Sequence, residues 1–120
     1  SDLVNAYKLF SEANKENPVI GISSYPVPVE WAFNLNESDS SLAPINPGMF
    51  KIRSQDLKKK YFDAGAFVLY TSYHILRANS SNQDENYIGL ILEKIKAIDI
   101  DDQEDWDFAE SIMQYILAKE

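Results

Sequence analysis

The spacing of apolar residues changes repeatedly along this 120-residue chain, and that alternation constrains the fold more than any other feature. Spacings of three and four, typical of amphipathic helices, recur near both ends of the chain. Short β-branched and aromatic runs, typical of strands, lie between them. Because alternating helices and strands form a sheet covered by helices, the pattern predicts an α/β fold with a mixed, partly parallel sheet.

The first half of the chain is expected to contain one helix and two strands. We expect the helix over 2–16, with Asp2 capping its first turn and Asn17-Pro18 ending it. A buried strand is expected over 19–23, and two prolines restrict 25–29 to an edge or a crossover. Alternation over 31–35 predicts a second strand, and the polar residues over 36–49 predict a loop.

The second half repeats this alternation. One or two helical turns are expected over 53–62, a turn over 63–65, a strand over 66–70, and a helix from 71 or 72 to about 78 with Ile75 and Leu76 facing inward. A polar loop over 79–86 then leads to a strand over 87–92, whose extended pattern continues toward Asp99 and Asp101. The last helix is the clearest, with one apolar stripe formed by Trp106, Ala109, Ile112, Met113, Ile116 and Leu117.

Composition excludes several functional classes. The chain has 11 basic and 19 acidic residues and a net charge of −8, which disfavours binding to a nucleic-acid backbone. It has no cysteine, so disulfides, thiolate metal sites and cysteine nucleophiles are excluded. No apolar run approaches the roughly 20 residues that span a bilayer, so we expect one soluble domain and no membrane partner.

Asp99-Ile100-Asp101 is the strongest candidate for a chemical site. At the end of a strand, residues i and i+2 point to the same face, so the two carboxylates are expected to project together. Paired carboxylate oxygens suit a Mg²⁺ ion that is also held by a nucleotide phosphate, and ligands bind at the carboxyl ends of strands in open α/β sheets. The alternative is that these acids only complement the dipole of the following helix.

Two further segments could contact a ligand. Arg53 and Gln55 place a guanidinium and an amide close together, a combination that can bind a carboxylate or sugar hydroxyls. Gly65 follows Asp63-Ala64 at a turn where the backbone can approach a ligand closely. The alternatives are a solvated, charged turn and a glycine that merely opens a strand.

Taken in order, these segments resemble one enzyme family. The matching stretches are 25–33, RSQDL over 53–57, DAG over 63–65 with the two residues that follow, DID over 99–101 and EDW over 104–106. They are similar to the C-terminal half of the acylneuraminate (CMP-nonulosonic acid) cytidylyltransferases, and within that family to the pseudaminic acid cytidylyltransferase branch. The resemblance covers about 1–118 and implies a Rossmann-like nucleotide-diphospho-sugar transferase fold, a homodimer and a cytoplasmic enzyme of CMP-sugar biosynthesis that serves flagellin glycosylation.

The resemblance also implies an activity and its residues. The family transfers CMP from CTP to a nonulosonic acid of the sialic or pseudaminic type and releases pyrophosphate, with Mg²⁺ as cofactor and CTP as co-substrate. By match to its motifs, Asp99 and Asp101 are the metal ligands, and the substrate-binding residues are Arg53, Gln55, Gly65 and Phe67. The segment from about 28 to 52 matches the dimerisation element, with Trp31, Phe33, Met49 and Phe50 at the interface. Lys58 stands where relatives commonly have proline, and Val68 lies where they commonly have an aromatic residue.

The CTP-binding loop of the family, an Arg- and Gly-rich stretch in its N-terminal portion, has no counterpart in these 120 residues. The sequence opens at Ser1-Asp2, without methionine and directly in a helical pattern. We therefore expect one domain that is the C-terminal portion of a cytidylyltransferase, which on its own does not turn over. The alternative is a non-catalytic domain that associates with itself through an aromatic surface.

Overall fold

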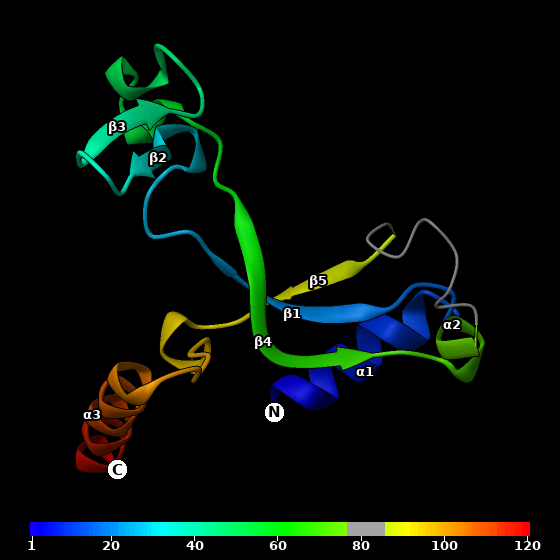
Figure 1. Cartoon of the computed structure of the whole chain (residues 1–120). Helices are drawn as coiled ribbons and strands as arrows, with labels where there is room; N and C mark the ends of the chain where they lie inside the picture. The colour runs from blue at the N-terminus through cyan, green and yellow to red at the C-terminus, as the bar shows by residue number, and fades with distance from the viewer. Residues whose placement is uncertain (77–85) are drawn as a thin grey trace. The chain divides into compact units, whose positions relative to one another are not determined.

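A computed structural model describes residues 1–76 and 86–120, and its helices and strands form two compact units (Figure 1). The first, here called the sheet unit, comprises Ser1–Ser23 and Asp63–Glu120. The second, the hairpin unit, comprises Ser24–Phe62. The hairpin unit is thus a continuous piece of chain inserted into the sheet unit.

Helix α1, Asp2–Glu12, opens the sheet unit and is shorter than expected. Ser1, and not Asp2, caps it, because the Ser1 side chain accepts a hydrogen bond from the Val4 amide. Asp2 instead forms an ion pair with Lys96, at 3.0 Å. The helix ends before Asn17-Pro18 because Asn14 and Lys15 adopt left-handed backbone conformations, with φ of 53° and 59°.

Three strands form the sheet, in the order β4-β1-β5. Strands β1, Val19–Ser24, and β5, Ile88–Ile91, pair in parallel with Val19 opposite Ile88. Strand β4, Tyr61–Leu69, runs in the opposite direction on the other side of β1 (Figure 1). The expected α/β class with a mixed sheet is confirmed, and so is the strand over 19–23.

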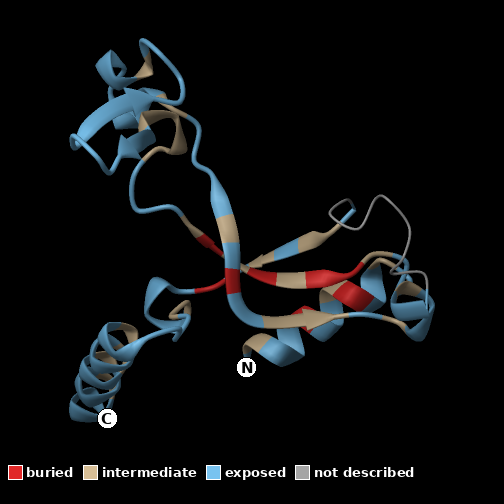
Figure 2. Ribbon diagram, in the orientation of Figure 1, coloured by how far each residue is buried: buried red, intermediate tan, exposed pale blue. Residues whose placement is uncertain are grey.

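The core of the sheet unit lies between α1 and this sheet. Ala6 and Phe10, four residues apart on one face of α1, are buried against Val19 of β1 (Figure 2). The half-buried residues packed on this cluster are Leu9, Phe67, Leu69, Ile88 and Leu90. Each strand of the sheet therefore contributes to one small apolar core.

The hairpin unit contains an antiparallel pair of short strands, β2, Phe33–Asn36, and β3, Ser41–Pro44. The strand expected over 31–35 is wrong at its start, because Trp31 belongs to a 3₁₀ turn, Val29–Trp31. The loop expected over 36–49 is wrong where β3 lies. Its polar residues make the connecting turn, since Asn36 Oδ1 accepts from the Ser38 amide at 3.0 Å and Asp39 Oδ1 from the Ser41 amide at 2.9 Å.

Other elements differ from expectation in their extent. A single 3₁₀ turn, Ser54–Asp56, matches the helical turn expected in 53–62. The turn and strand expected over 63–70 form one strand with the preceding residues, so Gly65 lies inside β4. Helix α2, Ser72–Leu76, leaves Ile75 and Leu76 exposed, contrary to the prediction that they face inward. The loop expected over 79–86 lies outside the described residues except for its last position.

Strand β5 also ends earlier than the sequence suggested. It stops at Ile91 and is followed by a 3₁₀ turn, Lys94–Lys96, so Asp99 and Asp101 do not sit at the end of a strand. The charged residues Glu93, Lys94 and Lys96 interrupt the apolar pattern, and the pairing with β1 ends before them, at Ile91.

Helix α3, Gln103–Lys119, confirms the last predicted helix. A reciprocal capping box starts it: the Asp102 side chain accepts from the Asp105 amide, and the Asp105 side chain accepts from the Asp102 amide. The helix has no buried residue, and Trp106, Met113 and Leu117 of its apolar stripe are exposed. Among the described residues, α3 and the shorter helices all lack the length and apolar character needed to cross a membrane.

Candidate functional site

The predicted site residues fall into two groups, one in each unit. The sheet unit holds Asp99, Asp101, Gly65 and Phe67, and the hairpin unit holds Arg53, Gln55, Trp31, Phe33, Met49 and Phe50.

In the sheet unit, the Asp99 carboxylate lies against Gly65 of β4. A Cβ atom added to Gly65 would lie 3.1 Å from Asp99 Cγ, 3.1 Å from Oδ2 and 3.3 Å from Oδ1. Gly65 has a φ of 65°, and its amide donates to Asp63 Oδ1 at 2.9 Å. The space beside Gly65, where a ligand is expected to approach the backbone, is thus filled by the Asp99 carboxylate.

Asp99 and Asp101 both carry carboxylate oxygens, the ligand type that Mg²⁺ prefers. Both side chains are exposed, and within the described residues neither carboxylate has a hydrogen bond or an ion pair of its own. The nearby Asp105 carboxylate is already occupied, because it accepts from the amides of Asp101 and Asp102 at 3.1 and 3.2 Å. Two free carboxylates fit a Mg²⁺ ion that takes its remaining ligands from water and phosphate.

These two residues do not make a closed metal cage. Over 1–76 and 86–120, no three Asp, Glu or His side chains are grouped so that they could hold a metal ion together. Strong binding of Mg²⁺ would therefore depend on a ligand that brings its own oxygens.

Phe67 lies within the core of the sheet unit. Its ring edge is 3.3 Å from the position that a Cβ atom on Gly21 of β1 would occupy, and it packs on the cluster of α1 and β1. The ring is half-buried. In the described structure its contacts are those of a packing residue.

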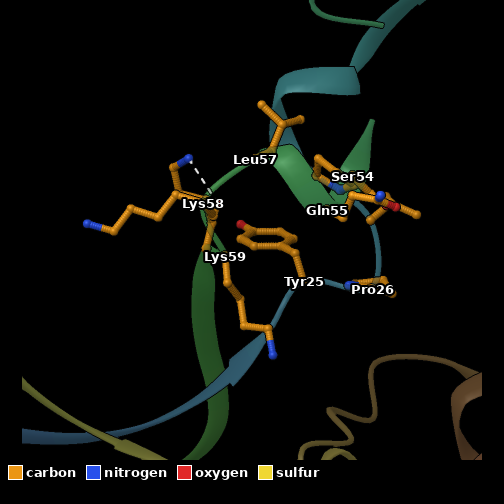
Figure 3. A pocket seen from close by; sticks show the side chains of 10 residues that line it. Tyr25, Pro26, Ser54, Gln55, Leu57, Lys58 and Lys59 are labelled. Atoms are coloured by element: carbon orange, nitrogen blue, oxygen red, sulfur yellow. Dashed lines mark hydrogen bonds between the residues drawn. The ribbon is translucent and has the colours of Figure 1, made fainter. Parts of the chain in front are cut away.

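The hairpin unit contains a pocket of about 310 Å³ beside Gln55. Its lining consists of Tyr25, Pro26, Val27, Pro28, Ser54, Gln55, Leu57, Lys58, Lys59 and Lys60. Figure 3 shows the Tyr25 ring between the Lys58-Lys59 stretch and the turn that carries Ser54 and Gln55. The Tyr25 amide donates to the Lys60 carbonyl at 3.1 Å, which fixes the two sides of the pocket to each other. The site thus combines an amide and cationic groups with an apolar wall.

The three lysines of this pocket are not equivalent. Lys60 forms an ion pair with Glu30, and its hydrogen bond holds the pKa of the Glu30 carboxyl below its ordinary value. Within the described residues, Lys58 and Lys59 have no acidic partner. These two ammonium groups are therefore the ones available to an anionic ligand.

The Arg53 guanidinium is less available to an anionic ligand, because it is already paired with the Asp56 carboxylate. Its Nε donates to Asp56 Oδ2 at 2.9 Å, and Nη2 donates to Asp56 Oδ1 at 3.4 Å. Both side chains are exposed to solvent, so the pair is accessible. A ligand that binds Arg53 must compete with the Asp56 carboxylate.

The aromatic residues of the predicted interface gather in the same unit. The Phe50 ring makes edge contacts with Trp31 and Phe33, with ring centroids 5.9 and 5.7 Å apart. The Trp31 indole donates to the Ile52 carbonyl at 3.2 Å, and Met49 is half-buried in the next turn. Phe50 nevertheless remains 64% exposed, so this aromatic cluster presents an apolar face to solvent.

Known proteins resemble the chain in sequence. No protein-family model matches the chain. Two pseudaminic acid cytidylyltransferases, from Campylobacter jejuni serotypes O:23/36 and O:2, are each 32% identical to it over 107 residues. The chain is related to the pseudaminic acid cytidylyltransferases.

The match to these cytidylyltransferases covers 89% of the chain but only 45% of each relative. The resemblance seen in the sequence is confirmed, and the chain spans less than half the length of the relatives it matches. Their name assigns to them the transfer of a cytidylyl group to pseudaminic acid.

Sequence reasoning missed part of the hairpin-unit pocket. Tyr25 and the Lys58–Lys60 run were not named as site residues, although Tyr25 begins one segment that matched the family and the lysines directly follow another. The signal was present in the three consecutive lysines, which are unusual in a chain of net charge −8. The sequence does not show that they line one pocket with Tyr25, because this depends on pairing between segments that are distant in sequence.

Proposed function

We propose that this chain is the part of a CMP-nonulosonic acid cytidylyltransferase that binds the sugar acid and Mg²⁺ and forms the dimer. The observation that carries the proposal is the 32% identity to pseudaminic acid cytidylyltransferases over 89% of the chain. The α/β architecture of the sheet unit is compatible with the Rossmann-like nucleotide-sugar transferase fold that this function requires. The complete cytoplasmic enzyme would also need a CTP-binding portion, so the chain alone is proposed to be inactive.

In this proposal Asp99 and Asp101 hold the metal in the sheet unit. Bound Mg²⁺ would neutralise phosphate charge during transfer of CMP. The two aspartates contribute hard oxygen ligands and leave positions for the phosphates of CTP. Their lack of protein partners, within the described residues, supports this role.

The pocket of the hairpin unit is proposed to bind the sugar acid. Lys58 and Lys59 attract its carboxylate, and the Gln55 amide can exchange hydrogen bonds with its hydroxyls. Tyr25 and the flanking prolines supply an apolar wall for the sugar ring. Arg53 joins this site when a ligand carboxylate replaces Asp56 as its partner.

A chimaera tests the function of the chain as a whole. The matched segment of the Campylobacter jejuni relative is replaced by this chain, and pyrophosphate release is measured with CTP, pseudaminic acid and Mg²⁺. We expect Mg²⁺-dependent activity that Asp101→Asn reduces by at least about 100-fold, because a metal ligand is lost. Asp107→Asn, on the same acidic stretch but bonded to Gln103, serves as the control. A folded chimaera without pyrophosphate release contradicts the proposal.

The second candidate function is a non-catalytic domain that associates with itself. The observation in its favour is the aromatic cluster of Trp31, Phe33 and Phe50, in which both phenylalanines are exposed. Both candidates predict a dimer, so sedimentation cannot separate them. Binding of Mn²⁺ in the presence of CTP that depends on Asp99 and Asp101 supports the enzyme, and its absence under the same conditions supports the interaction domain.

A further inference from the structure

We propose that Gly65 is a positioning residue for the metal site: because it has no side chain, it leaves the space beside β4 that the Asp99 carboxylate occupies. The inference rests on the proposed function, because it takes Asp99 as a ligand of Mg²⁺. It assigns Gly65 a role different from contact with the sugar. The juxtaposition joins a glycine of β4 to an aspartate beyond the end of β5.

The three distances at Gly65 describe how the carboxylate is oriented. A Cβ atom on Gly65 would lie 3.1, 3.1 and 3.3 Å from Cγ, Oδ2 and Oδ1 of Asp99. Near-equal distances to all three atoms mean that this position faces the flat side of the carboxylate and not one of its edges. The oxygen lone pairs lie in the carboxylate plane. A contact on its flat face therefore leaves the lone pairs free to bind a metal ion.

A side chain at residue 65 would therefore displace the Asp99 carboxylate, the proposed ligand of the metal. Contacts of 3.1 Å are tighter than those that most Cβ atoms make, so the Asp99 carboxylate would have to shift by a few tenths of an ångström. Mg²⁺ demands near-ideal octahedral geometry and tolerates such shifts poorly. Substitution of Gly65 should consequently weaken metal binding without removing any ligand.

The backbone at Gly65 is fixed by a second interaction. Its φ of 65° lies in the left-handed region that favours glycine. The Gly65 amide donates to Asp63 Oδ1 at 2.9 Å, which holds this bend inside β4. Asp63 thus stabilises the conformation that receives Asp99 and is not itself placed among the metal ligands.

Binding of Mn²⁺ to the 120-residue chain tests the proposal. Bound Mn²⁺ is measured by electron paramagnetic resonance, and its location by paramagnetic broadening of the backbone amide signals in NMR spectra. We expect broadening centred on Asp99 and Asp101. In Gly65→Ala we expect Mn²⁺ to bind at least about tenfold more weakly, which is the smallest effect typical of losing a residue that supports a metal ligand. Gly48→Ala is the matched control, since Gly48 also has a left-handed φ, of 87°, but nothing lies within 4 Å of an added Cβ.

A double substitution separates positioning from general loss of structure. If Gly65 acts through Asp99, then Gly65→Ala causes no further loss of Mn²⁺ binding in a chain that already carries Asp99→Asn. Equal losses in both backgrounds overturn the proposal. Undiminished binding in folded Gly65→Ala also overturns it, and leaves the metal site intact. Absence of broadening near Asp99 in the unsubstituted chain overturns the metal site itself, and with it this part of the proposed function.

Two substitutions of Asp63 test the proposal if Gly65→Ala does not fold. Asp63 is exposed, so its substitution leaves the core unchanged. Asp63→Asn keeps the oxygen that accepts from the Gly65 amide, whereas Asp63→Ala removes it. We expect weaker Mn²⁺ binding, by about threefold or more, in Asp63→Ala than in Asp63→Asn. Equal binding in the two variants contradicts the role given to this bend.

Discussion

Lys60 donates a hydrogen bond to the Glu30 carboxylate and thereby joins the two ends of the hairpin unit. Glu30 is half-buried, and its Oε2 has no hydrogen-bond partner among the described residues. The carboxylate is therefore stabilised through one oxygen by one cation. The stability of the hairpin unit should respond to pH through this pair.

Acid should destabilise the hairpin unit through Glu30. The hydrogen bond from Lys60 lowers the pKa of Glu30 from its ordinary value of 4.5. A group with a lowered pKa stabilises the fold above its ordinary pKa, and this contribution is lost as the pH falls through the lowered value. The NMR signal of the Trp31 indole, which is bonded to Ile52, should report loss of structure below about pH 4.5. Lys60→Met should flatten this pH dependence, whereas Lys59→Met should preserve it.

Lys58 and Lys59 should make the hairpin-unit pocket selective for an anion. We expect N-acetylneuraminic acid to shift the amide signals of Gln55 and Tyr25 in NMR titrations, and its methyl ester to bind more weakly because it lacks the charge. The substitutions Lys58→Gln and Lys59→Gln together should reduce the affinity for the acid about tenfold and leave the affinity for the ester unchanged. Lys8→Gln in α1 is the control. Equal loss for both compounds would show that the lysines only shape the pocket.

Phe50 should dominate association between copies of the chain. It is 64% exposed and contacts both Trp31 and Phe33. Truncation of a central aromatic residue at an interface costs about 2 kcal/mol or more, equivalent to about a 30-fold rise in the dimer Kd. Sedimentation of Phe50→Ala over a concentration series measures this rise. Leu76→Ala, which removes another exposed apolar side chain, should leave the dimer Kd unchanged.

The capping box should determine how much of α3 is helical. Because α3 has no buried residue, little packing compensates for a lost cap. Asp102→Ala removes the acceptor for the Asp105 amide and should cost about 1 kcal/mol of helix stability. Asp102→Asn keeps an equally effective cap and is the control. Amide chemical shifts over the first turn should move toward coil values in the alanine variant alone.

The elements predicted best are those whose signals are local. Strand β1 follows from a compact β-branched run, and α3 from an apolar stripe preceded by capping acids. Strand β3 was missed because Ser41–Pro44 has no strand-like pattern of its own and is formed by pairing with β2. Pairing between strands depends on contacts that composition does not show.

The candidate site shows the same division. Asp99, Asp101 and Gln55 could each be predicted as candidate site residues from their residue type and the short segment around them. The sequence gives no sign that Gly65 makes room for Asp99, because the two belong to separate parts of the chain. The apolar run before Asp99 also suggested a longer strand, whereas Glu93 and the turn after it end β5.

The hairpin unit leaves the sheet from β1 and returns to it through β4, and these two strands are hydrogen-bonded neighbours. Both ends of the insertion therefore start from adjacent positions, and the bond from the Tyr25 amide to the Lys60 carbonyl closes its base. A segment attached in this way can be exchanged for another, or for a short turn, without altering the pairing of β4 with β1 or the contact of Gly65 with Asp99. Selection can thus change the surface that is proposed to recognise the sugar acid and the second subunit, while the residues proposed to bind the metal stay in place.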